Sequence, residues 1–226
     1  MGVATLVALP ASVEAAGRVV TFRAEDGRTI TGLLMEADQR PAPAVVLVPM
    51  LGRPKDDWQA VGQKLADANV TALAIDLPGS TVPEDPKQLA SWSDEIRAAV
   101  SFLASRAGEV RPGSIGVAGA SLGGTLAALE AVGDGGVRAI ALISPSLDYR
   151  GLRIEGAMKA YGGRPALLVA SAHDPYAARS TRELAQGAAG PRDIRWSEVS
   201  AHGTVLLARD PELVRSIVEW FQAALG

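Results

Sequence analysis

The chain has 226 residues, a net charge of −3 and no cysteine, and 48% of its residues are hydrophobic. This length and composition suit a single α/β domain, 1–226, with a sizeable core. The lack of cysteine excludes disulfides, thiolate metal sites and a cysteine nucleophile, and two histidines exclude a histidine-rich metal centre. The slightly acidic balance argues against nucleic acid as a partner, and no apolar run has the length of a membrane-spanning helix.

The N-terminal stretch 1–17 is apolar over 3–10 and consists mostly of small residues after that. A cleavage-like Val13-Glu14-Ala15 favours an export signal, but a positively charged start is missing. We therefore expect an ordered strand or packing arm. A cytoplasmic and a secreted location both stay open, as does a place for this chain as one domain of a longer protein.

Two segments with alternating apolar residues, 18–24 and 29–35, flank the turn sequence Glu25-Asp26-Gly27 and predict an antiparallel hairpin. The fully apolar run 44–48 predicts a strand buried on both faces. A hairpin followed by about six strand–helix units predicts a mostly parallel, doubly wound sheet. We expect further strands at 71–75, 137–143, 166–170 and 194–199, and helices at 56–69, 91–106, 125–132 and 214–224.

The segment Gly119-Ala120-Ser121-Leu122-Gly123 is a G-x-S-x-G pattern between an apolar stretch and a helical one. The pattern is typical of a sharp strand-to-helix turn that strains the serine backbone and exposes its hydroxyl. The residues two before and two after the serine approach each other closely, so both must lack a side chain. The alternative is a glycine-rich turn that only packs tightly. Catalytic partners for Ser121 further along the chain decide between a nucleophilic and a structural serine turn.

Asp174 and His202 each stand just after a predicted strand, as Ser121 does, so all three should lie at the carboxyl edge of the sheet. A serine hydroxyl needs a base with a pKa near neutral, and His202 can take its proton and return it to a leaving group. Asp174 would fix the imidazole tautomer. His173 is the other histidine, and its place beside Asp174 indicates a loop or rim residue. Asp148 is the rival acid.

The G-x-S-x-G turn around Ser121, here called the elbow, and the chain order serine, acid, histidine resemble the α/β-hydrolase superfamily. The resemblance covers nearly the whole chain. The resemblance implies an α/β-hydrolase fold of about eight strands with an N-terminal antiparallel hairpin. It implies Ser121 as nucleophile, Asp174 as acid and His202 as base, without metal or cofactor. Lid domains in this family interrupt the chain after the strand that follows the elbow. Here only 146–151 joins that strand to the next helix, so we expect no lid.

Acyl transfer also needs backbone N–H donors for the oxyanion. The resemblance implies the N–H of Leu122 as one donor and an N–H from the loop after the strand 44–48 as the other. Many family members have His-Gly in that loop, whereas this chain has Pro49-Met50 followed by Leu51-Gly52. Alignment on Asp57-Trp58 favours Leu51, with Met50 as the alternative.

The compact size resembles that of dienelactone hydrolases, which use cysteine where this chain has serine, and this favours a carboxylesterase. An open site suits small esters or accessible polyesters, so we expect a small-molecule or polymeric ester as partner. Arg53, Trp58 and Tyr176 are candidates for the rim of the site. The same triad would serve an amidase, a peptidase or a perhydrolase, and a binding protein on the hydrolase fold is the alternative outside enzymes. Oligomeric state and substrate preference stay open.

Overall fold

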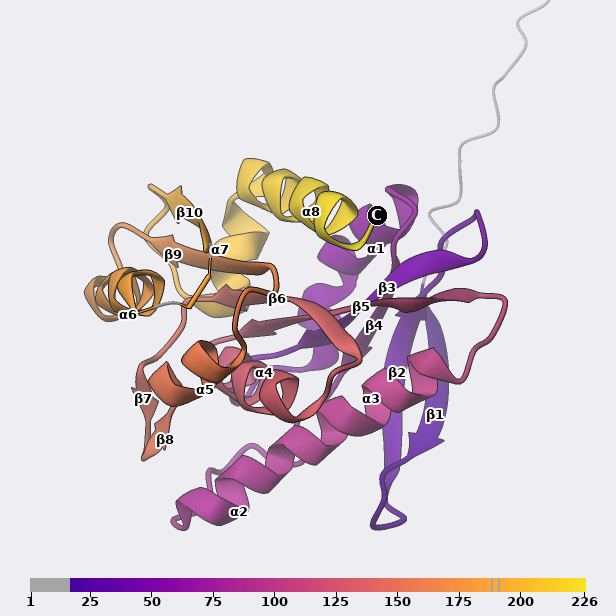
Figure 1. The fold of residues 1–226 in the computed structure, drawn as a ribbon, viewed down its shortest axis with the longest axis horizontal. Helices are drawn as coiled ribbons and strands as arrows, with labels where there is room; N and C mark the ends of the chain where they lie inside the picture. The colour runs from indigo at the N-terminus through magenta and orange to yellow at the C-terminus, as the bar shows by residue number, and fades with distance from the viewer. Residues whose placement is uncertain (1–16, 188, 191) are drawn as a thin grey trace, which may run out of the picture.

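A computed structural model gives the fold and describes residues 17–187, 189–190 and 192–226 (Figure 1). The expected N-terminal arm lies outside the described residues, apart from Gly17. The central sheet has the strand order β1-β2-β4-β3-β5-β6-β9-β10. These strands are β1 (Arg18–Arg23), β2 (Thr29–Met35), β3 (Ala42–Val48), β4 (Thr71–Ile75), β5 (Val110–Ala120), β6 (Val137–Ile143), β9 (Ala166–Ser171) and β10 (Asp193–Ser197).

Strand β2 is antiparallel to both of its neighbours, and all other adjacent pairs in the sheet are parallel. The predicted fold class, a mostly parallel sheet that begins with an antiparallel hairpin, is confirmed. Strand β3 is buried along its whole length. Its alternate residues Val46 and Val48 face one apolar cluster, whereas Val45 and Leu47 face the other. The period of two thus divides one apolar run between two cores.

Helices cover both faces of the sheet (Figure 1). Helices α1 and α8 contribute to the apolar cluster on one face, and α3, α4 and α5 contribute to the cluster on the other. The helices are α1 (Gln59–Asp67), α2 (Pro86–Ala90), α3 (Asp94–Ala104), α4 (Leu122–Gly133), α5 (Glu155–Ala160), α6 (Pro175–Gln186), α7 (Gly203–Arg209) and α8 (Pro211–Leu225). None of these described helices is long and apolar enough to span a membrane.

The strand order reverses its direction at β3. The chain moves from β3 to β4 on one side and then crosses back to β5 on the other side. Right-handed crossovers in opposite directions place their helices on opposite faces, which explains why α1 and α3 lie on different sides. The loops after β3 and β5 therefore diverge, and ligands bind doubly wound sheets at such a switch point. Ser121 directly follows β5.

Some helix boundaries differ from the prediction. The helix expected over 56–69 begins as a 3-10 turn, Lys55–Trp58, and α1 ends at Asp67 shortly before Asn69, which has a φ of 61°. Several small elements were not expected: helix α2, helix α7, and the hairpin of β7 (Asp148–Tyr149) and β8 (Leu152–Arg153). That hairpin and α5 are the only regular elements between β6 and β9 in the described chain, so no lid domain is evident there.

Candidate active site

Ser121 occupies a sharp turn between β5 and α4. Its φ of 50° and ψ of −115° lie in a region that non-glycine residues rarely adopt, so the backbone is strained. The turn holds because the Ser121 N–H donates to the Ile143 carbonyl oxygen at 2.8 Å. A Cβ at Gly119 would lie 2.5 Å from the Gly124 nitrogen, so the turn requires a glycine there. Leu122 is the first residue of α4, where helix N–H groups lack intrahelical partners.

The second glycine of the elbow packs against the end of β3. A Cβ there would lie 2.5 Å from the carbonyl oxygen of Pro49. The residues after Pro49 form a turn in which the Arg53 N–H donates to the Met50 carbonyl oxygen at 3.2 Å, and Gly52 has a φ of 70°. A positive φ at the third position is typical of a type II turn, and Leu51 holds the second position. Both candidates for the second oxyanion donor therefore lie in one turn beside the elbow.

His202 and Asp174 are in direct contact, with 2.5 Å between His202 Nδ1 and Asp174 Oδ2. The other Asp174 oxygen accepts the Ala177 N–H at 3.2 Å and caps α6. The positive end of the helix dipole favours a negative charge at this position. A carboxylate only accepts, so Nδ1 donates and Nε2 of the neutral imidazole is left as the acceptor. The Asp174 side chain is 17% exposed and that of His202 is 44% exposed, so the acid is shielded while the imidazole is accessible.

The backbone beside His202 is anchored close to the elbow. The Gly203 N–H donates to Ser144 Oγ at 2.9 Å. Ser144 directly follows Ile143, whose carbonyl oxygen binds the Ser121 N–H, so one strand end holds both segments. In the described part of the chain the Ser121 hydroxyl forms no hydrogen bond. Its pairing with His202 stays a prediction, and such catalytic hydrogen bonds often tighten only when substrate binds.

Two serines in this framework were missed by the sequence reasoning. Ser144 is 1% exposed and has a φ of 50°, a second strained residue at this edge of the sheet. Ser171 is fully buried, and its Oγ donates to the Val199 carbonyl oxygen at 2.7 Å and accepts the His173 N–H at 3.0 Å. It thereby ties the end of β9 to the loop that carries His202. Their signal in the sequence is a small hydroxyl residue at the end of an apolar strand.

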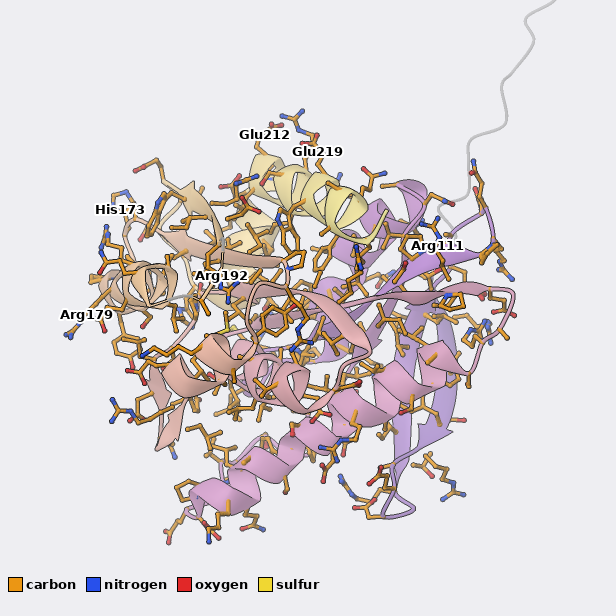
Figure 2. All side chains as sticks on the ribbon, in the orientation of Figure 1. Arg111, His173, Arg179, Arg192, Glu212 and Glu219 are labelled. Carbon is orange, nitrogen blue, oxygen red and sulfur yellow. The ribbon has the colours of Figure 1, made fainter. Side chains whose placement is uncertain are left out.

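The rival acid and the second histidine lie elsewhere. The Asp148 carboxylate accepts the Gly151 N–H at 2.7 Å inside the β7–β8 hairpin, so His202 pairs with a different carboxylate. His173 lies at the periphery of the molecule (Figure 2). Its Nε2 is 3.5 Å from Glu198 Oε2, and both side chains are largely exposed.

The three rim candidates differ in exposure. Arg53 is exposed, and its guanidinium binds the Asp57 carboxylate through Nε at 2.6 Å and Nη2 at 3.0 Å. Tyr176 is 53% exposed, and its hydroxyl donates to the Asp148 carbonyl oxygen at 3.0 Å. The expectation for Trp58 is wrong, because this side chain is 0% exposed and packs in the apolar cluster beneath α1. Trp58 is the last residue of the 3-10 turn Lys55–Trp58.

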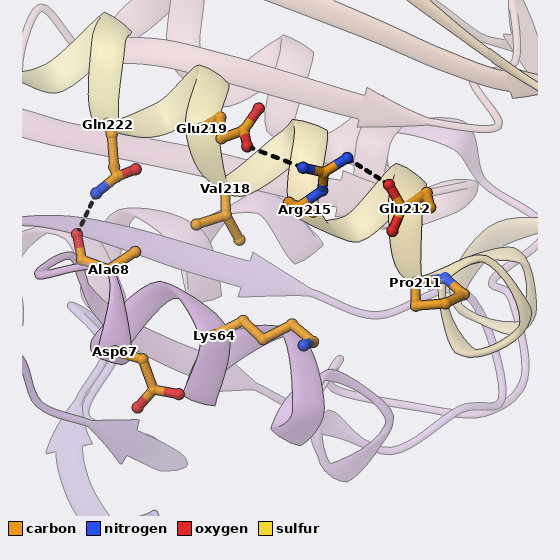
Figure 3. A pocket seen from close by; sticks show the side chains of 9 residues that line it. All are labelled: Lys64, Asp67, Ala68, Pro211, Glu212, Arg215, Val218, Glu219 and Gln222. Atoms are coloured by element: carbon orange, nitrogen blue, oxygen red, sulfur yellow. Dashed lines mark hydrogen bonds and ion pairs between the residues drawn. The ribbon is translucent and has the colours of Figure 1, made fainter.

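A groove of about 470 Å³ lies between α1 and α8 (Figure 3). Figure 3 shows Arg215 between Glu212 and Glu219, with which it forms ion pairs. None of the candidate catalytic residues lines this groove, so it is separate from the site at the sheet edge. Its lining residues are Lys64, Asp67, Ala68, Pro211, Glu212, Arg215, Val218, Glu219 and Gln222.

The comparisons with known proteins agree with this architecture. Residues 45–225 match the model of the alpha/beta hydrolase family. The chain belongs to this family. No curated protein matches the sequence.

Several solved structures share the fold. DcsB, solved in complex with its substrate analogue, has a TM-score of 0.80 at 13% identity, covering 93% of this chain and 99% of that one. EstE1, a thermophilic carboxylesterase cloned from a metagenomic library, has a TM-score of 0.75 at 19% identity, with 94% and 90% covered. A dienelactone hydrolase from Anabaena variabilis has a TM-score of 0.72 at 17% identity, with 93% and 98% covered. At these identities the likeness concerns the fold alone.

Proposed function

We propose that this alpha/beta hydrolase is a serine carboxylesterase that cleaves short-chain or accessible esters through an acyl-enzyme. The observation that carries the proposal is the 2.5 Å contact between His202 and Asp174 at the sheet edge where Ser121 occupies a strained elbow. A carboxylate that fixes an imidazole beside such a serine is the arrangement that activates a hydroxyl for attack.

In the proposed acylation step, Ser121 Oγ attacks the ester carbonyl carbon while His202 Nε2 takes the hydroxyl proton. The carbonyl oxygen becomes an oxyanion, which the N–H of Leu122 and a second N–H from Leu51, or alternatively Met50, stabilise. When the tetrahedral intermediate collapses, the carbon–oxygen bond to the alcohol breaks and His202 returns its proton to the alkoxide. Asp174 stays ionised and stabilises the imidazolium.

Deacylation repeats these steps with water in place of Ser121 Oγ as nucleophile. His202 removes a proton from the water, and the bond between the acyl carbon and Ser121 Oγ breaks as that oxygen regains a proton. The free acid then leaves. This chemistry uses only the side chains and N–H groups named here.

The connection from β6 to α5 supports a preference for small or accessible esters, since the described chain adds only a short hairpin there. Exposed Arg53 and Tyr176 are the proposed rim residues. EstE1 is a carboxylesterase, and the esterase domain of a Rhodothermus marinus protein has a TM-score of 0.73 at 18% identity. These neighbours make ester hydrolysis the first activity to test.

The test is hydrolysis of p-nitrophenyl esters from acetate to palmitate by the wild type, Ser121→Ala and the control Ser216→Ala. Ser216 lies on α8, and among the described residues its hydroxyl bonds only the Leu213 carbonyl oxygen of the same helix. We expect activity on short chains that falls by about 10³-fold or more in Ser121→Ala and persists in Ser216→Ala. Activity that survives Ser121→Ala would overturn the proposal. Inactivity on every ester would shift the weight to an amidase or a binding protein.

A further inference from the structure

The Asp57 carboxylate joins two segments that lie 147 residues apart in the sequence. Its Oδ2 accepts the Thr204 hydroxyl at 2.9 Å and Arg53 Nε at 2.6 Å, and its Oδ1 accepts Arg53 Nη2 at 3.0 Å. Thr204 is 2% exposed, and the Asp57 side chain is 16% exposed. The carboxylate is thus largely shielded and bonded from two directions.

These partners belong to the two loops that the proposed chemistry needs side by side. Arg53 closes the turn that contains Met50 and Leu51, the candidate oxyanion donors. Thr204 is the second residue of α7 and lies two positions after His202. The loops also touch directly. A Cβ on the glycine between His202 and Thr204 would lie 2.5 Å from Met50 Sδ. The carboxylate therefore spans a contact between the donor turn and the base loop.

The negative charge of Asp57 strengthens its hydrogen bonds to Arg53 and Thr204. Burial alone would raise its pKa, but the hydrogen bonds from Arg53 and Thr204 outweigh burial and lower the pKa below its usual value. The group is therefore a carboxylate at neutral pH and only accepts, so the Thr204 hydroxyl must donate. Charge-assisted hydrogen bonds of this kind are shorter and stronger than neutral ones.

We propose that Asp57 is a positioning residue that sets the distance between the oxyanion-donor turn and His202 by binding Arg53 and Thr204 at once. The inference rests on the proposed function, because it assigns a role within that reaction. Donor N–H groups act on the transition state only at the right distance, and a displacement of about 1 Å can cost about 10²-fold in rate. A loss of the Asp57 contacts should therefore lower kcat more than it changes KM.

The test compares Thr204→Val, which keeps the shape of the side chain but removes the donor, with Thr204→Ser, which keeps the hydroxyl. Asp57→Asn is a second way to weaken the same contacts. The matched control is Thr181→Val, since Thr181 is fully buried in α6 and its hydroxyl has no partner among the described residues. The readouts are kcat and KM on p-nitrophenyl acetate, the melting temperature, and amide hydrogen exchange of a peptide covering 50–54.

We expect Thr204→Val and Asp57→Asn to lower kcat by about 10- to 100-fold, with KM within about threefold and faster exchange at 50–54. Thr204→Ser should retain most of kcat, and Thr181→Val should change neither kcat nor the exchange at 50–54. An unchanged kcat in folded Thr204→Val would overturn the inference. So would an equal loss in Thr204→Ser that follows the melting temperature, because it would indicate a merely structural role.

The exchange measurement separates the two proposals. If the wild type cleaves no ester, the proposed function fails. The amide exchange at 50–54 then tests by itself whether Asp57 holds the donor turn through its contacts with Arg53 and Thr204. Faster exchange in Thr204→Val but not in Thr204→Ser would show that Asp57 orders the turn. Unchanged exchange in both variants would overturn the inference whatever the activity of the wild type.

Discussion

His202 Nδ1 and Asp174 Oδ2 are 2.5 Å apart, and the second oxygen of the same carboxylate caps α6. The acid is thereby held from two sides, by the imidazole and by the backbone N–H of Ala177. The helix fixes the carboxylate, and the carboxylate fixes which imidazole nitrogen carries the proton.

Asp174→Asn should lower kcat by about 10³- to 10⁴-fold, because an amide can donate to Nδ1 and so favours the wrong imidazole tautomer. Asp148→Asn is the matched control, since the Asp148 carboxylate accepts the Gly151 N–H within its own hairpin. Steady-state kinetics on p-nitrophenyl acetate checks both variants. Similar losses in the two variants would contradict the assignment of the acid.

Leu51→Pro should lower kcat by about 10²- to 10³-fold while the protein stays folded. Proline removes the N–H group, but it suits the second position of a type II turn, which prefers a φ of about −60°. Met50→Pro tests the alternative donor in the same assay. Full activity of Leu51→Pro together with a large loss in Met50→Pro would move the donor to Met50.

Gly119→Ala should lower the free energy of unfolding by about 1–3 kcal/mol or more, because the new Cβ meets the backbone on the far side of the elbow. Gly133→Ala serves as control, since a Cβ at this helix end meets nothing within 4 Å. Its expected effect is neutral or a gain of about 0.5–1 kcal/mol. Urea unfolding measures both variants, and equal stabilities would show that the elbow is less tight than described.

Tyr161 should ionise late in an alkaline titration. Burial raises the pKa of Tyr161 to about 12, and its hydroxyl bonds the Arg138 and Pro165 carbonyl oxygens at 3.2 and 3.1 Å. The folded pKa lies above the unfolded value of 10.0. The buried neutral phenol therefore contributes fully to the free energy of unfolding below pH 10, and this contribution is lost as the pH rises through 12. The shift corresponds to roughly 2–3 kcal/mol.

Absorbance at 295 nm checks the Tyr161 prediction. The difference between the wild type and Tyr161→Phe should show a tyrosine that ionises near pH 12. A difference spectrum that develops fully by pH 10 would contradict the burial argument.

Ser121, Asp174 and His202 could be nominated from the sequence because each directly follows an apolar strand, and the carboxyl ends of parallel strands share one edge. The sequence favoured Asp174 over Asp148 as the acid, and the structure pairs His202 with Asp174. Both residues follow strands, and only the β7–β8 hairpin shows that Asp148 is bonded within its own turn. Strands of two residues are too short for a sequence pattern to predict.

The error at Trp58 and the Asp57 contacts have a different physical cause. The sequence indicated a helix from residue 56 or 57, but a 3-10 turn, Lys55–Trp58, comes first. Trp58 is the last residue of this turn and is 0% exposed, so it lies in the core and not at the rim of the site. The contact between Asp57 and Thr204 joins residues 147 positions apart, and no local pattern encodes such a pair.

The most direct test of the account is covalent labelling with a fluorophosphonate, followed by intact and peptide mass spectrometry. The reagent traps an activated serine regardless of the acyl group that the enzyme prefers. The account predicts one adduct per chain, located on Ser121, with none in Ser121→Ala and strongly slowed labelling in His202→Ala. A folded wild type that takes no label, or a label that persists in Ser121→Ala, would contradict the assignment of Ser121 as the nucleophile.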